Sequence, residues 1–347
     1  MKNKVSIAQR QIGPGEPVFL VAETGTTCNG DLDTALRMVD AAKTAGMDAI
    51  KFMIIDPDYF MSDKSVTYEY DTASGHQKEN MYEMFKALKF SPEAWQRIRQ
   101  HCQDQEIIFY ATIDYLPGVE LGKSLDLAAY KLSSWDAANF PLARRMAQTG
   151  KPIQVDLGPT YITDIEKLLN VIHQENNDQV ILVHCSHAKN NDGINIRSVP
   201  YLQDVFQVPV GYSADSREFV TDVAAVALGA HLIEKRLTLD HNGPGHHDNK
   251  ALEPDELTDY VKMIRETEAA LGDYALTPSD EDLRQKELYF VSIAADADIP
   301  AGTTITEDMV ACKRPGNGIQ PEFLPLILGR QAKRDIACNT LLSWDDV

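Results

Sequence analysis

The sequence lacks the features that define several classes of protein. No run of about 18 apolar residues occurs, so no membrane-spanning helix is predicted. The first residues show neither an apolar core nor a small-residue cleavage site, so no secretory signal is expected. The five cysteines are scattered, odd in number and without metal-finger spacing, which favours a reduced, cytoplasmic protein.

Positive charge is also scarce. The chain has 33 Lys and Arg residues against 52 Asp and Glu, which gives a formal net charge of -19. A chain this acidic is not expected to bind nucleic acid. Any anionic substrate must therefore be bound by a local group of Lys, Arg and backbone N–H groups against the overall field.

Eight short apolar segments alternate with segments of helical periodicity. Near-continuous apolar strands separated by helices predict a parallel sheet, and eight such units predict an α/β fold closed into a (β/α)8 TIM barrel. The barrel's last helix is expected over Glu253–Leu271. The Asp-, Tyr- and Ser-rich stretch Ile54–Asn80 predicts an active-site loop or lid. The predicted strands are Val18–Glu23, Ala49–Met53, Ile107–Thr112, Ala128–Ser133, Pro152–Leu157, Val180–Cys185, Val208–Tyr212 and His231–Arg236.

The composition changes after the predicted barrel. Residues 1–271 are assigned to the barrel, and the polar, acidic residues 272–286 are assigned to a linker. Residues 287–347 show short alternating runs separated by turns, which predict a small, mostly β domain.

Two lysines lie inside predicted strands. Lys51 ends the second strand, and Lys131 lies in the fourth. Burying an ammonium group without a partner is costly, so two such lysines favour a pocket for phosphate or carboxylate. The alternative is a structural ion pair with Glu23 or Asp136.

Motifs along the whole chain resemble those of the sialic acid synthase (NeuB-type) family, which condenses phosphoenolpyruvate with an N-acylated amino sugar. In the barrel they are AETGTTCNGD around Glu23, GYSAD at Gly211–Asp215, and ALGAHLIEKRLTLD followed by a Gly-rich loop closing on ALEP. DIPAGT at Asp298–Thr303 and KRPGNGI at Lys313–Ile319 are similar to the antifreeze-like SAF domain that ends these enzymes.

The resemblance implies roles for matching residues. Glu23 and Asp136 would address the acceptor sugar. Arg314 matches an arginine that the SAF domain of one subunit extends over the barrel of its partner, which implies a homodimer with swapped SAF domains. The implied phosphoenolpyruvate site comprises Lys51, Thr112, Lys131, Ser134 and Ser213.

Several positions depart from the family pattern. Asp215 and Arg236 replace the two histidines that bind the family's divalent metal. Asp156 replaces a serine expected near phosphate, where like charges about 4 Å apart cost on the order of 4 kcal/mol at an effective dielectric near 20. His187 replaces a small polar residue and is expected to relieve this repulsion by pairing with Asp156. Trp135 replaces a glycine and is expected to narrow the pocket.

Three accounts of the altered metal position stay open. In the first, the Asp215–Arg236 pair replaces the metal, and the guanidinium polarises the aldehyde. In the second, a divalent metal such as Mn, Mg or Zn has moved. In the third, catalysis has been lost. Candidate ligands for a moved metal are His187, Asp215, His246, His247 and Asp248.

The predicted function is condensation of phosphoenolpyruvate with an N-acylated amino sugar or related aldehyde to a nonulosonic-type acid. The new acids, histidine and arginine stand together at strand ends, which indicates altered chemistry rather than random decay. One alternative is a lyase or transferase in which Asp156 and His187 form a new acid–base pair. The other is a non-catalytic sugar-binding protein that keeps only the scaffold.

Overall fold

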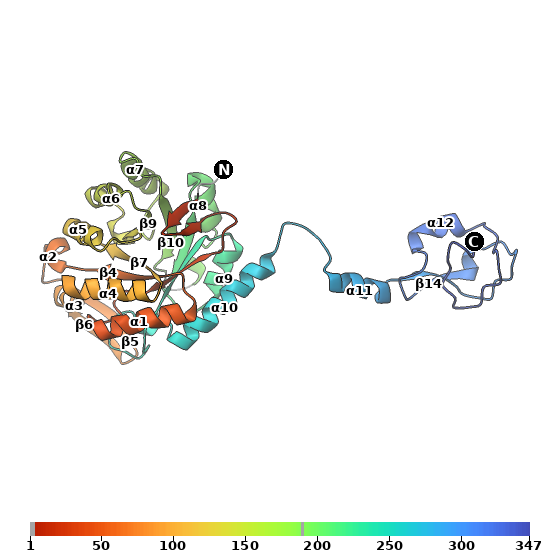
Figure 1. Ribbon diagram of the computed structural model, residues 1–347, viewed down its shortest axis with the longest axis horizontal. Helices are drawn as coiled ribbons and strands as arrows, with labels where there is room; N and C mark the ends of the chain where they lie inside the picture. Colours follow the sequence, from red (N-terminus) through yellow and green to blue (C-terminus); the bar gives the residue numbers. More distant parts are fainter. Residues whose placement is uncertain (1–3, 189–190) are drawn as a thin grey trace. The chain divides into compact units, whose positions relative to one another are not determined.

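The computed structural model describes residues 4–188 and 191–347 (Figure 1). The chain folds as two compact units that divide between Gly272 and Asp273.

The first unit is a closed barrel of eight parallel strands, ordered β3-β4-β7-β8-β9-β10-β11-β12 around the circle. The predicted TIM-type fold is confirmed, and each predicted strand end lies within two residues of the observed one. The strands are β3 (Phe19–Glu23), β4 (Ala49–Ile54), β7 (Ile108–Ile113), β8 (Tyr130–Leu132), β9 (Ile153–Asp156), β10 (Val180–Ser186), β11 (Val210–Ala214) and β12 (Leu232–Arg236).

Helices surround the barrel and cover the outer face of its strands (Figure 1). The sequence sets their ends, as α1 shows: Asp31 caps its first turn by accepting from Thr34 N, and Gly46 ends it in a left-handed conformation. The helices are α1 (Leu32–Ala45), α4 (Pro92–Asp104), α5 (Leu116–Ser124), α6 (Phe140–Ala147), α7 (Ile162–His173), α8 (Ser198–Phe206), α9 (Val220–Ala227) and α10 (Pro254–Leu271).

An antiparallel hairpin closes the N-terminal end of the barrel. It consists of β1 (Val5–Ile7) and β2 (Arg10–Ile12). Its apolar side chains pack against residues from the first half of the barrel strands, among them Phe19, Ala49 and Leu232.

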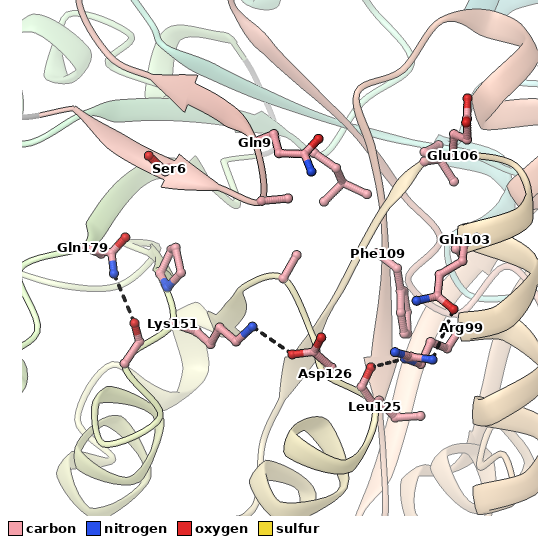
Figure 2. A pocket seen from close by; sticks show the side chains of 17 residues that line it. Ser6, Gln9, Arg99, Gln103, Glu106, Phe109, Leu125, Asp126, Lys151 and Gln179 are labelled. Carbon is pink, nitrogen blue, oxygen red and sulfur yellow. Dashed lines mark hydrogen bonds and ion pairs between the residues drawn. The ribbon is translucent and has the colours of Figure 1, made fainter.

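A cavity of about 1000 Å³ lies at this same N-terminal end (Figure 2). Its two basic side chains already have partners: Lys151 pairs with Asp126 at 2.9 Å, and Arg99 donates to Leu125 O at 2.6 Å. Reactive groups of TIM barrels lie at the opposite end, so this cavity is not the candidate site.

The stretch after β4, predicted as a loop or lid, is largely ordered into regular elements. These are α2 (Pro57–Phe60), a hairpin of β5 (Thr67–Thr72) and β6 (Gly75–Asn80), and α3 (Met81–Ala87). The prediction missed the hairpin because its strands are polar on both faces. Short 3-10 turns follow other strands, namely η1 (Ser134–Asp136), η2 (Asn191–Gly193) and η3 (Asp248–Lys250).

The first helix of the second unit starts within the predicted linker and ends three residues beyond it. This helix, α11 (Asp280–Tyr289), is capped by Ser279 and has no buried residue. A small core of isoleucines and Leu342 follows, around one antiparallel pair, β13 (Ser292–Ala295) and β14 (Val310–Lys313). Its short helical pieces are η4 (Glu307–Met309), η5 (Pro321–Phe323) and α12 (Leu324–Ile327). No helix in the described part of the chain is long and apolar enough to cross a membrane.

Candidate active site

The barrel interior changes from apolar to charged along the strands. In β12, Leu232 joins the apolar cluster at the N-terminal end, and Glu234 and Arg236 follow at alternate positions toward the carboxyl end. The same change occurs in β8, where Ala129 precedes Lys131 by two residues. Because side chains alternate across a strand, these charges point into the barrel near its carboxyl end.

Glu234 connects both lysines that the sequence singled out. Lys131 Nζ lies 2.6 Å from Glu234 Oε1 and 2.6 Å from Asp156 Oδ2. Lys51 Nζ lies 3.5 Å from the same Glu234 oxygen and forms an ion pair with Glu23. All five side chains are buried. Two ammonium groups and three carboxyl groups therefore share one enclosed site.

Neutral side chains complete this network. Lys51 donates to Thr112 Oγ1 at 3.1 Å. Gln154 Nε2 donates to Glu234 Oε2 at 2.7 Å, and Tyr110 donates to Gln154 Oε1 at 2.6 Å. The site is thus pre-ordered by internal hydrogen bonds, which is expected of buried charges.

The protonation of the network follows from burial and pairing. Burial opposes the charge on Lys131, but Asp156 and Glu234 together raise its pKa above the usual value. Burial lowers the pKa of Lys51 to about 7, against the raising effect of Glu234. Burial also raises the pKa of Asp156, although Lys131 opposes this. Between Asp156 and Glu234, the two carboxyl groups that contact Lys131, Asp156 is therefore the one more easily protonated, because the pKa of Glu234 is lowered.

Two expectations about Asp156 and its surroundings were wrong. Asp156 pairs with Lys131 and not with His187. His187 instead stacks on Trp135, with ring centroids 4.7 Å apart, and its Nε2 lies 3.4 Å from Ser134 Oγ. The Trp135 side chain does not fill the pocket, because the residue is 72% exposed.

Asp215 and Arg236 form the predicted pair, and Lys250 joins them. Asp215 accepts from Arg236 Nε at 3.2 Å and from Lys250 Nζ at 2.6 Å. Although burial opposes it, Arg236 and Lys250 lower the pKa of Asp215. The group carries two cations and one anion, so it presents a net positive charge at the carboxyl end of the barrel.

Gly25 makes room for this arrangement. Its φ is +51°, and a Cβ at this position would lie 2.8 Å from His247 Nδ1 and 3.0 Å from an Arg236 guanidinium nitrogen. Glycine is therefore required both by the backbone conformation and by the approach of these two side chains.

The histidine pair in the loop after β12 is neutral. His246 Nε2 lies 2.7 Å from the Tyr68 hydroxyl of the β5–β6 hairpin, and His247 Nδ1 lies 3.2 Å from Thr26 Oγ1. Burial, with Arg236 adding to it, lowers the pKa of His246 to about 4 and lowers the pKa of His247 well below its usual value. The hairpin thus covers the loop at the barrel mouth, where a lid was predicted.

The candidate ligands do not fit a divalent metal. Asp215 already binds two cations, and Asp248 accepts from Thr238 Oγ1 at 2.8 Å and from Gly245 N at 2.7 Å, as a turn-forming residue does. Within residues 4–188 and 191–347, no three His, Cys, Asp or Glu side chains are arranged to bind a metal ion. The positive charge of Arg236 and Lys250 beside the imidazoles further opposes one.

Sequence reasoning missed three charged residues of the site, Glu234, Lys250 and Asp114. Glu234 lies two residues before Arg236 and therefore on the same inward face of the strand. Asp114 directly follows β7, the position where barrel enzymes carry reactive groups. Burial and the nearby Asp136 raise the pKa of Asp114 to about 7. Lys250, in a loop turn, gave no such signal.

Ser213 and Arg314, the last two predicted site residues, lie in different units of the chain. Ser213 is paired in register with Glu234 across β11 and β12, which places it beside the charged network. Arg314 belongs to the second unit, where its Nε donates to Tyr289 O at 2.7 Å.

Comparison with known proteins gives the family. The NeuB family model matches residues 38–275, and the SAF domain model matches residues 290–347. An uncharacterized protein of Methanocaldococcus jannaschii is 33% identical over 99% of this chain and 98% of its own. The spore coat polysaccharide biosynthesis protein SpsE of Bacillus subtilis is 31% identical over 98% of this chain and 96% of its own.

A solved structure agrees with this result. The N-acetylneuraminic acid synthetase of Leptospira borgpetersenii has a TM-score of 0.73 and 26% identity, covering 82% of this chain and 95% of that one. The resemblance inferred from the motifs is thereby confirmed: the chain belongs to the NeuB family and carries an SAF domain after its barrel.

Proposed function

We propose that the protein joins phosphoenolpyruvate to the carbonyl carbon of an N-acylated amino sugar or a related aldehyde, giving a nonulosonic-type acid and phosphate. One observation carries the proposal: Lys51, Thr112 and Lys131 meet inside the carboxyl end of a NeuB-family barrel. Relatives named for this kind of chemistry include the pseudaminic acid synthase of Campylobacter jejuni, 31% identical over 95% of this chain.

Phosphoenolpyruvate would bind to the two lysines with help from Thr112, Ser134 and Ser213. In the free protein, Asp156 occupies a donor of Lys131. The incoming anion replaces Asp156 there, and Asp156 takes up a proton because its pKa is already raised by burial. Binding of phosphoenolpyruvate is thus coupled to proton uptake.

The acceptor aldehyde would be polarised without a metal. Arg236 and Lys250 bind the same carboxylate, Asp215, and leave net positive charge beside it. Guanidinium and ammonium donors stabilise the charge that develops on a carbonyl oxygen during attack. Glu23 and Asp136 would contact the acceptor's hydroxyl groups.

Arg314 supports a dimeric arrangement in this proposal. It stands in the KRPGNGI motif of the SAF domain, as in the family's arginine that reaches a partner barrel. The active form would be a homodimer in which each SAF domain supplies Arg314 to the other subunit's acceptor.

The test is phosphate release from phosphoenolpyruvate over a panel of N-acyl hexosamines, with and without chelator. Acceptor-dependent release that survives the chelator is the expected result. Lys131→Ala should abolish it, because the ammonium contacts the donor anion, and Lys167→Ala, on an exposed face of α7, serves as the control. Absence of release with every acceptor, or full activity of Lys131→Ala, contradicts the proposal.

The non-catalytic alternative makes a different prediction in the same experiment. Tight binding of an acidic sugar without phosphate release would favour it. The acid–base alternative lacks its pair, because Asp156 contacts Lys131 and His187 stacks on Trp135.

A further inference from the structure

Four buried side chains form a closed ring of contacts inside the barrel. Lys131 Nζ contacts one oxygen of each of two carboxyl groups, Glu234 Oε1 at 2.6 Å and Asp156 Oδ2 at 2.6 Å. Gln154 Nε2 contacts the other oxygen of each, Glu234 Oε2 at 2.7 Å and Asp156 Oδ1 at 3.4 Å. The two acids therefore share an ammonium donor on one side and an amide donor on the other.

Tyr110 fixes the direction of the Gln154 amide. Its hydroxyl donates to Gln154 Oε1 at 2.6 Å, and both side chains are fully buried. A flipped amide would turn its carbonyl oxygen toward Glu234, so that two acceptors would face each other in a buried site. The two amide hydrogens are therefore directed at the two carboxyl groups of the ring.

The two carboxyl groups are not held equally. Glu234 accepts the shorter bond from Gln154, and its Oε1 also lies 3.5 Å from Lys51 Nζ. Asp156 is held by Lys131 and by the longer contact from Gln154. Although burial opposes it, the two lysines and the Gln154 amide lower the pKa of Glu234 to about 2, whereas burial raises the pKa of Asp156. Asp156 is therefore the member of the ring that an incoming anion displaces.

We propose that Gln154 is a positioning residue that keeps Glu234 and Asp156 both ionised until the donor anion binds. The identity of that anion as phosphoenolpyruvate rests on the proposed function. When the anion contacts the Lys131 ammonium, Asp156 gives up its ion pair and takes one proton from solvent to become a neutral acid. Glu234 stays ionised, because Gln154 and Lys51 still hold it. Without the amide, the two carboxyl groups would depend on the lysines alone and would already share a proton in the free protein.

Other titratable groups surround the ring and set the pH at which it is tested. Burial lowers the pKa of Lys51 to about 7, so this ammonium already carries its charge at pH 6. Burial raises the pKa of Tyr110 and of Cys185 and lowers the pKa of His187, so these three favour the neutral form at pH 6. Proton uptake at pH 6 is therefore assigned to the carboxyl groups of the ring. The titratable side chains around the ring are Glu23, Lys51, Tyr110, Cys185 and His187.

The test is calorimetric titration with sulfate at pH 6 in two buffers of different ionisation enthalpy. Sulfate has the shape and charge of a phosphate dianion but does not titrate at this pH, so the difference between the buffers gives the number of protons that the protein takes up. Wild-type protein should take up about one proton per site, and its affinity should fall about tenfold per pH unit as pH rises. In Gln154→Leu the uptake should fall to about half a proton or less, and the pH dependence of affinity should flatten. Lys131→Ala should abolish binding, which would place the sulfate at the ring.

Two further variants separate this role from a structural one. Tyr110→Phe leaves the amide in place but removes the donor to its Oε1, so proton uptake should change in the same direction by a smaller amount. Gln203→Leu is the matched control, because Gln203 is a buried glutamine on α8, outside the barrel interior, that donates to Gly229 O at 2.6 Å. It also removes a buried hydrogen bond, but it should leave the proton count unchanged.

Phosphate release from phosphoenolpyruvate, measured on the same proteins, separates failure of this inference from failure of the proposed function. If sulfate binding shows proton uptake that depends on Gln154 but no acceptor supports phosphate release, the proposed function fails and the role of Gln154 stands. An unchanged proton count in Gln154→Leu overturns that role whatever the activity. Should this variant not fold, an unchanged count in Tyr110→Phe overturns it instead. Absence of sulfate binding to wild-type protein also contradicts it, because the role requires an anion that displaces Asp156.

Discussion

Replacing Asp156 with serine should make the protein bind phosphoenolpyruvate more tightly. Asp156 Oδ2 lies 2.6 Å from Lys131 Nζ, so an anion bound at Lys131 meets this carboxyl group directly. Two like charges about 4 Å apart repel by about 4 kcal/mol at an effective dielectric near 20. Proton uptake by Asp156 reduces that cost, because burial has already raised its pKa.

The expected gain in affinity for phosphoenolpyruvate lies between the full repulsion and the repulsion that remains after proton uptake by Asp156. A remaining cost of about 1.4 to 4 kcal/mol corresponds to a KM for phosphoenolpyruvate that is roughly 10- to 1000-fold lower in Asp156→Ser. The gain should increase with pH, because at low pH the wild-type carboxyl group is already protonated. Initial rates of phosphate release at pH 6 and pH 8 measure both effects, and calorimetric titration measures the affinity directly.

Asp156→Asn provides the control for charge against size. It removes the negative charge but keeps the shape of the side chain, so it should lower KM in the same direction as serine. A folded Asp156→Ser protein with an unchanged or higher KM at both pH values would refute the displacement of Asp156 by the substrate anion.

Three other changes test the packing behind the site. Glu234→Gln should lower the free energy of unfolding by about 3–5 kcal/mol, since it leaves the buried ammonium of Lys131 short of a partner. Because Lys131 and Lys51 lower the pKa of Glu234 to about 2, the wild-type stabilisation is complete above about pH 4.5 and is lost as pH falls toward 2. Urea titrations should show a smaller pH dependence of stability in the variant. Gly25→Ala should lower stability by about 1–2 kcal/mol through backbone strain. It should reduce turnover more than stability, because the new Cβ displaces His247. Turnover equal to that of wild type would argue against close packing of His247 on Gly25. Lys235→Met should lower the free energy of unfolding by about 3–5 kcal/mol, because it leaves the buried carboxylate of Asp222 unpaired. A melting temperature equal to that of wild type would contradict this.

The barrel was predictable because its signals are local. Each strand is a short apolar run, and the ends of α1 are marked in the sequence by the N-cap Asp31 and the C-cap Gly46. Residues that end strands were predictable for the same reason, since all parallel strands direct their carboxyl ends to one face. Lys51 and Lys131, which lie within β4 and β8, were expected to share a pocket, and both lie close to Glu234.

Partner choice inside the barrel was not predictable from these signals. Lys131 on β8 contacts Asp156 on the neighbouring strand β9 and Glu234 on β12, four strands away around the circle, and the sequence pattern does not specify which of the inward side chains meet. The α11 helix was missed because its sequence is mostly charged and its few apolar residues show no helical periodicity. Trp135 was expected to narrow the pocket, because the volume of its side chain follows from the sequence, whereas its direction is set by the η1 turn.

The altered residues make sense together as a redistribution of charge. A divalent metal would supply two positive charges at one point, and Arg236 with Lys250 supplies the same formal charge spread over two side chains. Asp215 offsets one of these charges, and Asp156 adds a negative charge beside the donor site. An anionic substrate therefore meets less positive charge than a metal site would offer. Under the proposed function, binding of phosphoenolpyruvate is expected to be coupled to uptake of a proton, and Asp156, whose pKa is raised by burial, is the group expected to accept it. Tight binding of phosphoenolpyruvate should for this reason be favoured at low pH.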